Sequence, residues 1–399
     1  MKKIFKYVLM TAVVCSFGSF FISCGNDKND DADRTTETPP PTPTPTVNAE
    51  DYDATNAAQW GNYMVVVANL LKADAQTLYN QWNNGYAALF KNHNSNEYQS
   101  AIQCVEQILD GCIDIADEVG NAKIGEPYNL YMDNQVVAAI YAVESWYSWH
   151  SREDYRNNIY SIRNAFYGTR NGSKAENSLY TLLGQHNPDL QQKADRLING
   201  TANAIMDIPQ PFRNHINSAE SVEAMTACSA LSQFIEEELK PYFQEHLNDN
   251  ATLDPIVQQY VDAVVLPTYK DLAEKNIALS KAVNDFKAAP SNNGFVACAN
   301  AWLDARTPWE QSEAFLFGPV SELGLDPNMD SWPLDQAQIA EILKSQNFVN
   351  LEWNGDYEEL DENGNGTEQA KKISTAQSLR GFHTLEYLIF KDGQARTVK

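Results

Sequence analysis

The sequence predicts an all-α fold made of two domains that each resemble a four-helix bundle. Long stretches without proline carry apolar residues three and four positions apart, which is the spacing of an amphipathic helix. The alternation of apolar and polar residues that marks a half-buried strand is scarce. Short turns join the helical stretches, as they do in antiparallel bundles.

The start of the chain is typical of a lipoprotein signal peptide. Lysines precede an apolar stretch over residues 7–22, and a small residue precedes Cys24. We expect that residues 1–23 are removed, that Cys24 is acylated, and that residues 24–48, acidic and then rich in Thr and Pro, form an extended tether. A plain secretory signal is an alternative. A single anchor helix fits less well, because the apolar run is shorter than about 20 residues.

Helix-breaking residues divide the rest of the chain in order. The first predicted helix ends at Asn84-Gly85, and the fourth ends before Gly168. Asn187-Pro188 marks a further break. Asp254-Pro255 begins a helix with Asp as the cap and Pro in the first turn, and Pro267 must kink or split this helix. The predicted helices cover residues 53–84, 97–119, 131–150, 152–167, 188–207, 217–247, 254–286, 294–304, 309–317, 335–346 and 374–391. Two bundle domains over residues 49–254 and 255–399 follow from this pattern.

Charge and cysteine content limit the partners of this protein. The formal net charge of −24 argues against binding to nucleic acid or to anionic lipid, and it is compatible with binding cations. Solubility alone explains it equally well. No C-x-x-C motif is present, so we expect buried free thiols, with one disulfide possible in an extracytoplasmic compartment.

The most informative segment runs from Gly381 to Phe390. In a helix, His383 and Glu386 lie on the same side, next to an apolar face. A partly dry histidine and glutamate can bind a metal ion or share a proton. The alternative is a structural pair at the edge of the core.

Three sequence blocks in order resemble the imelysin-like superfamily, also classed as peptidase family M75 or the insulin-cleaving family. They are Trp309 to Pro319, Asp330 to Asp335, and Gly381-x-His383-x-x-Glu386-Tyr387-Leu388. The segment from Val264 to Tyr269 is similar to the one that opens the family's first domain. Together these blocks cover about residues 262–392.

The order of the remaining sequence departs from the family pattern. Residues 144–150, Asp154, Asn158 and residues 162–168 are similar to the family's second bundle, which here precedes the GxHxxE motif. The resemblance therefore implies a circular permutation of the same two bundles.

The resemblance also implies a functional site between the bundles, in a protein of the bacterial envelope linked to iron uptake. It carries His383 and Glu386 over as the motif, with Gly381 giving close backbone approach. Glu313 is the best further metal ligand, because it is the acidic residue within the Trp309–Pro319 block. The residues expected to face these from the other bundle are Glu144, Ser148, Asp154 and Arg163.

The candidate site suits metal binding better than zinc proteolysis. No H-E-x-x-H is present, and one histidine with several carboxylates suits iron at least as well as zinc. We therefore expect a lipid-anchored envelope protein that binds iron, zinc or a metal chelate, with an uptake protein as partner. The alternatives are a metallopeptidase that uses His383 and Glu386, and a purely structural pair.

Overall fold

The computed structural model describes residues 52–361 and 363–398, and it confirms the all-α fold. The predicted signal peptide, Cys24 and the tether lie outside the described residues. None of the described helices is long and apolar enough to cross a membrane. The described cysteines, Cys104, Cys112, Cys228 and Cys298, are buried free thiols.

The first half of the described chain is helical, and α1 is its longest helix. The helices of this half are α1 (Ala57–Gln81), η1 (Trp82–Tyr86), α2 (Ala87–Lys91), α3 (Ala101–Asp117), η2 (Glu118–Ile124), α4 (Gly125–Met132), α5 (Val136–Ala142), α6 (Ser151–Tyr167), α7 (Leu179–His186), α8 (Pro188–Asp207), η3 (Phe212–Asn214), α9 (Ala219–Phe234), η4 (Ile235–Leu239) and α10 (Lys240–His246). Of these, η1, η2 and η4 are π-helical turns that continue the preceding α-helix.

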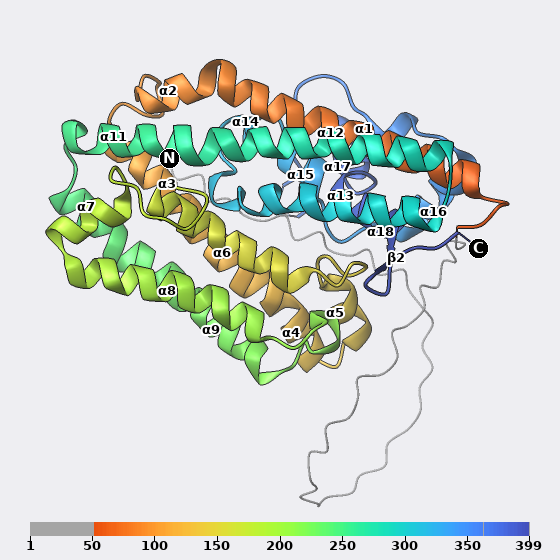
Figure 1. Ribbon diagram of the computed structural model, residues 1–399, viewed down its shortest axis with the longest axis horizontal. Helices are drawn as coiled ribbons and strands as arrows, with labels where there is room; N and C mark the ends of the chain where they lie inside the picture. Colours follow the sequence, from red (N-terminus) through yellow and green to blue (C-terminus); the bar gives the residue numbers. More distant parts are fainter. Residues whose placement is uncertain (1–51, 362, 399) are drawn as a thin grey trace, which may run out of the picture.

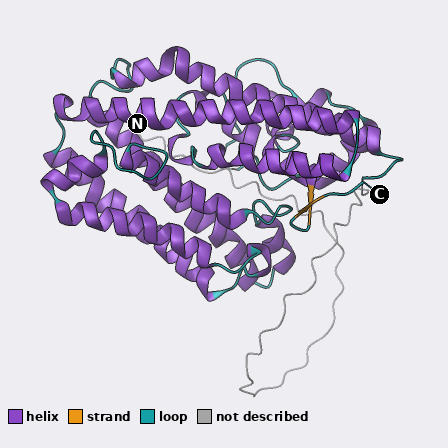
Figure 2. Ribbon diagram, viewed as in Figure 1, coloured by secondary structure: helices purple, strands orange, loops and turns teal. Residues whose placement is uncertain are grey.

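The second half contains the long α11–α12 rod and the two strands of the described chain. Its elements are α11 (Asn250–Tyr260), η5 (Val261–Val265), α12 (Leu266–Ala288), α13 (Asn292–Glu310), η6 (Glu313–Phe315), α14 (Pro319–Glu322), α15 (Leu325–Asp330), α16 (Gln336–Ser345), η7 (Val349–Leu351), α17 (Glu368–Gln377), α18 (Gly381–Ile389), β1 (Phe390–Lys391) and β2 (Gln394–Ala395). The strands form an antiparallel hairpin in which Phe390 pairs with Ala395 (Figure 2).

The helices pack as two bundles. The first bundle consists of α3, α6, α8 and α9, and the second consists of α1, α12, α13 and α18. Figure 1 shows α1 and α12 running side by side along one edge of the molecule, with the first bundle below them. Helix α1 thus packs with the second bundle, although the boundary expected at 254/255 assigns it to the first. The reason is that α1 buries its apolar face against α12 and α18.

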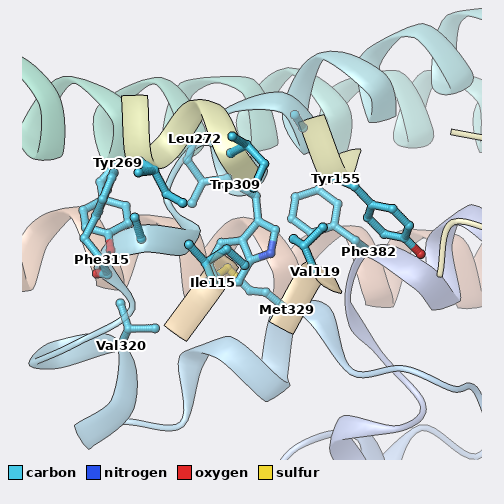
Figure 3. Packing of buried hydrophobic residues seen from close by; sticks show 14 of the residues in the cluster. Ile115, Val119, Tyr155, Tyr269, Leu272, Trp309, Phe315, Val320, Met329 and Phe382 are labelled. Atoms are coloured by element: carbon cyan, nitrogen blue, oxygen red, sulfur yellow. Dashed lines mark hydrogen bonds between the residues drawn. The ribbon is translucent and has the colours of Figure 1, made fainter. Parts of the chain in front are cut away.

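One hydrophobic core runs through both bundles. The indole of Trp309 on α13 lies among Ile115 and Val119 of the first bundle and Phe382 of α18 (Figure 3). The two bundles are therefore joined by packed side chains along α6, α13, α3 and η6. A polar group at this junction is removed from water.

Two predicted helices are interrupted in the structure. The helix predicted over 131–150 ends at Ala142, and residues 143–150 form a turn in which Ser145 and Trp149 have positive φ. The helix predicted over 374–391 is divided into α17 and α18 at Gly381, whose φ is +86°. In the opposite direction, α13 extends through Pro308 to Glu310, where two helices were predicted.

Candidate metal centre

Gly381 places the start of α18 against the end of α15. At φ +86° an L-residue is strained, and a Cβ atom here would lie 2.4 Å from the carbonyl oxygen of Met329. The close approach brings His383 of α18 beside Asp330, the last residue of α15. His383 is fully buried, and its ring centroid lies 5.0 Å from that of Trp332.

Both nitrogens of the His383 ring face carboxylates. Nδ1 lies 3.1 Å from Glu386 Oε2, while Nε2 lies 3.1 Å from Asp330 Oδ1 and 3.4 Å from Glu144 Oε1. A carboxylate oxygen accepts hydrogen bonds but does not donate them. The arrangement is therefore satisfied when the ring carries both protons, or when Nε2 binds a cation.

Glu386 is fixed from the side opposite to the ring. Its Oε1 accepts hydrogen bonds from the backbone N–H of Tyr147 at 3.0 Å, the N–H of Ser148 at 2.8 Å and the Ser148 hydroxyl at 2.7 Å. The turn over 143–150 aims these donors at one oxygen, which explains why this segment is not helical. Glu386 thus orients His383, as a carboxylate does for a metal-binding histidine.

Two further cations enter the site. The Arg306 guanidinium is fully buried and contacts Glu144 Oε1 and Asp330 Oδ1; it also lies 2.6 Å from Glu310 Oε1 and 3.5 Å from Asp154 Oδ2. The ammonium of Lys123, in the π-helical turn η2, lies 2.9 Å from Glu144 Oε2. Nη2 of Arg306 is 3.4 Å from His383 Nε2.

The carboxylates of this buried group outnumber its cations. We call it the acidic cluster; its carboxylates are those of Glu144, Asp154, Glu310, Glu313, Asp330 and Glu386, and its cations are those of Lys123, Arg306 and protonated His383. Uncompensated charge is costly away from water, so the cluster must bind protons or another cation.

The pKa values follow from this imbalance. Burial raises the pKa of Asp154 to about 7, although Arg306 opposes the shift. Burial also raises the pKa values of Glu310 and Glu313 well above the ordinary range. Burial opposes ionisation of Glu144 as well, but Lys123 and His383 lower its pKa to about 2. Burial and Arg306 act to lower the pKa of His383, yet Asp330 and Glu144 hold it well above its usual value.

The donor atoms fit a metal ion. Glu144, Asp330 and His383 form one group of potential ligands, and Glu310, Glu313 and Asp330 form a second. The separations of 3.1 Å and 3.4 Å around Nε2 match the roughly 3.0–3.4 Å between two ligands of one ion with bonds of about 2.1 Å. An imidazole with carboxylates suits iron, manganese or zinc.

The structure does not bring the three predicted metal ligands, His383, Glu386 and Glu313, together as one set. His383 is joined by Glu144 and Asp330. Glu386 lies on the Nδ1 side of the ring, and Glu313 belongs to the neighbouring group. Ser148 binds Glu386, and Asp154 faces Arg306 and accepts a hydrogen bond from Ser145.

Arg163 lies away from the acidic cluster. It follows Asp154 by about two and a half helical turns, so it occupies the opposite side of α6. Its guanidinium stacks 3.7 Å from the ring of Tyr160 and donates to Asn164. The guanidinium of the site is that of Arg306 instead.

Sequence reasoning missed Arg306, Asp330, Glu310 and Lys123 as site residues. Arg306 and Glu310 are four residues apart on one helix, and Asp330 opens a family block, so helical spacing and the block could have indicated them. No sequence pattern indicated Lys123, because the direction in which its side chain points depends on the π-helical turn η2.

Comparisons with known proteins agree with this architecture. The family model for imelysin, peptidase family M75, matches residues 32–237 and 265–399. Iron-regulated protein A of Synechococcus elongatus is 31% identical over 135 residues, which is 34% of this chain and 31% of that protein. The chain thus matches about a third of the length of this curated relative.

A solved structure resembles nearly the whole described fold. The crystal structure of an imelysin peptidase from Bacteroides ovatus has a TM-score of 0.84 and 52% sequence identity, and the match covers 88% of this chain and 99% of that one. Family model and structure agree on most of the chain. The chain belongs to the imelysin family.

Proposed function

We propose that this protein binds iron or a similar metal ion at the junction of its two bundles, as part of metal uptake at the cell envelope. The observation that carries the proposal is the geometry of His383. Glu386 fixes the Nδ1 side of the ring. Nε2 lies 3.4 Å from Glu144 Oε1 and 3.1 Å from Asp330 Oδ1, which are the separations expected between ligand atoms of one metal ion. The name of the Synechococcus relative supports iron as the metal.

The residues present define what each would contribute. Glu144, Asp330 and His383 Nε2 would hold the ion, and the ion would supply the positive charge that the acidic cluster lacks. Glu386 would keep the imidazole in the tautomer with a proton on Nδ1. Surrounding apolar side chains exclude water and strengthen these contacts.

Calorimetric titration of the purified protein with Fe²⁺ under anaerobic conditions, and with Zn²⁺ and Mn²⁺, tests the proposal. We expect saturable binding of at least one ion and its loss in His383→Ala. Glu245→Gln is the control, because the side chain of Glu245 is 72% exposed. Equal binding by wild type and His383→Ala would overturn the proposal.

A metallopeptidase is the second candidate, favoured by the name of the Bacteroides ovatus structure. His383 and Glu386 are both fully buried, so a polypeptide would reach them only after the bundles separate. Cleavage of unfolded protein substrates that is lost in Glu386→Ala would support this candidate. If His383→Ala and Glu386→Ala change neither binding nor cleavage but lower the melting temperature, the pair is structural.

The envelope location and the lipid anchor are part of the same proposal, supported by the pattern around Cys24. Mass spectrometry of the protein from its host membranes should find an N-terminal peptide that starts with acylated Cys24. A Cys24→Ser variant should keep residues 1–23 or leave the membrane fraction. An intact, unmodified N-terminus in the wild type would contradict the anchor.

A further inference from the structure

Arg306 occupies the same oxygens that a metal ion would use. Its guanidinium contacts Glu144 Oε1 and Asp330 Oδ1, the two carboxylate oxygens nearest to His383 Nε2. It also lies 3.4 Å from Nε2 itself. An ion bonded to all three ligand atoms would therefore touch the guanidinium.

We propose that Arg306 is a resident counter-cation that a metal ion must displace, so that Arg306 decides which ions the site accepts. This inference rests on the proposed function. Two positive charges in contact repel strongly where water is excluded, so the ion and the guanidinium cannot share Glu144 and Asp330. Without metal, Arg306 prevents these buried carboxylates from remaining unpaired.

A second set of acceptors lies next to the Arg306 guanidinium. Glu310 lies four residues further along α13, and its Oε1 is already 2.6 Å from Nη2 of Arg306. Asp154 Oδ2 lies 3.5 Å from Nε, and this buried Nε has no hydrogen-bond partner.

An unused acceptor lies beside Glu310. Asn158 is fully buried and donates through Nδ2 to Glu310 Oε2 at 2.5 Å, while its Oδ1 has no partner. A guanidinium that leaves Glu144 and Asp330 would keep its contact with Glu310 and turn towards Asp154, with the unpartnered Asn158 Oδ1 beside Glu310. Because Glu310 and Asp154 remain close to the guanidinium, Arg306 would keep anionic or polar partners after it leaves Glu144 and Asp330.

Competition with a guanidinium makes the site selective. A monovalent ion brings no more charge than Arg306 and gains nothing by replacing it. Mg²⁺ gives up its water reluctantly and prefers oxygen ligands. A transition-metal ion that bonds to imidazole gains most at His383 Nε2. Arg306 thus lowers the affinity of the site for every ion, and only an ion that bonds strongly to the imidazole overcomes this competition.

The test compares Arg306→Gln with Arg306→Lys by calorimetric titration of the full chain with Zn²⁺ and Mg²⁺. Gln removes the competing charge, so Zn²⁺ should bind about tenfold more tightly or better, and Mg²⁺ binding should become measurable. Lys keeps the charge, so its Zn²⁺ affinity should remain within about threefold of wild type. Arg196→Gln, at an exposed position, is the control.

A double variant provides a second test in case Arg306→Gln alone does not fold. Arg306→Gln with Glu310→Gln replaces both partners of the Arg306–Glu310 contact, so neither side chain loses a charged partner that the other keeps. It too should bind Zn²⁺ more tightly than wild type, because Glu144 and Asp330 are free of the guanidinium.

The outcomes separate the two claims. If wild type binds Zn²⁺ while both charge-removing variants bind it equally or more weakly, Arg306 positions the ligands and the displacement idea is overturned. If neither wild type nor the charge-removing variants bind any ion, the proposed function itself fails. Tighter binding in both, with Arg306→Lys unchanged, supports displacement.

Discussion

At the scale of single residues, the site depends on how one imidazole is surrounded. His383 has acceptors at both ring nitrogens, so it needs a second proton or a cation. Glu386 was expected to be a metal ligand, but its contacts make it the residue that orients the ring. The sequence could indicate the pair through its helical spacing. The family resemblance also pointed to Glu144 as a facing residue. It did not show that Glu144 and Asp330 meet at Nε2, because only the folded chain brings these two segments to one ring nitrogen.

The first prediction concerns Glu386. In Glu386→Gln, the loss of charge should weaken metal affinity about 10- to 100-fold, because the imidazole loses its anionic partner. The amide can still accept from Tyr147 and Ser148, so the fold should persist. Calorimetry and circular dichroism measure the two effects. An unchanged affinity would show that the carboxylate has no role in orienting His383.

The second prediction concerns pH. The pKa of Asp154 is about 7 in the folded protein against an ordinary value of 3.8, so between these values the folded state binds a proton that the unfolded state releases. This contribution to stability is therefore present at low pH and is lost as pH rises towards 7.

Urea unfolding of the chelator-treated protein between pH 4 and 8 measures this contribution. In Asp154→Asn the decline of the unfolding free energy over that range should become shallower. Identical profiles for the variant and wild type would contradict the assigned proton.

At the scale of elements, the sequence predicted helices well and their interruptions poorly. The helical period of α3, α8 and α16 is visible in the chain because each buries one face. The turn over 143–150 was predicted as helix, because its apolar residues keep helical spacing. Its conformation is fixed instead by hydrogen bonds to Glu386, which is 238 residues away from Ser148.

The third prediction concerns the start of α18. Gly381→Ala should destabilise the protein by about 2 kcal/mol or more and weaken metal binding, since the new Cβ would push α18 away from Met329. Gly200→Ala is the matched control: Gly200 lies inside α8 with nothing within 4 Å, so alanine should stabilise by about 0.5–1 kcal/mol. Thermal and urea unfolding measure both. Similar effects of the two changes would refute the role of Gly381.

At the scale of the whole molecule, two bundles share one core, and the proposed metal centre lies where they meet. The two-bundle architecture was predictable from helix number and spacing. The membership of α1 was not, because an apolar helical face does not say which bundle covers it. Segments from the two ends of the described chain, α1 and α18, lie in contact, as a circular permutation requires. The permuted order stays a prediction.

The fourth prediction follows from this shared core. Burial raises the pKa values of Cys104, Cys228 and Cys298 to about 12, and it raises that of Cys112 further. Thiols without thiolate character and without access react slowly. Alkylation with iodoacetamide at pH 8, followed by peptide mapping, should modify these four residues only after unfolding. Rapid modification in the native protein would contradict the continuous core.

The most direct test of the account is an anomalous difference map from crystals grown with Mn²⁺ or Zn²⁺, recorded at the absorption edge of the metal. We predict a peak within bonding distance of His383 Nε2, Glu144 and Asp330, with the Arg306 guanidinium turned towards Glu310. An ordered His383 with no peak beside Nε2 at saturating metal would contradict the central claim.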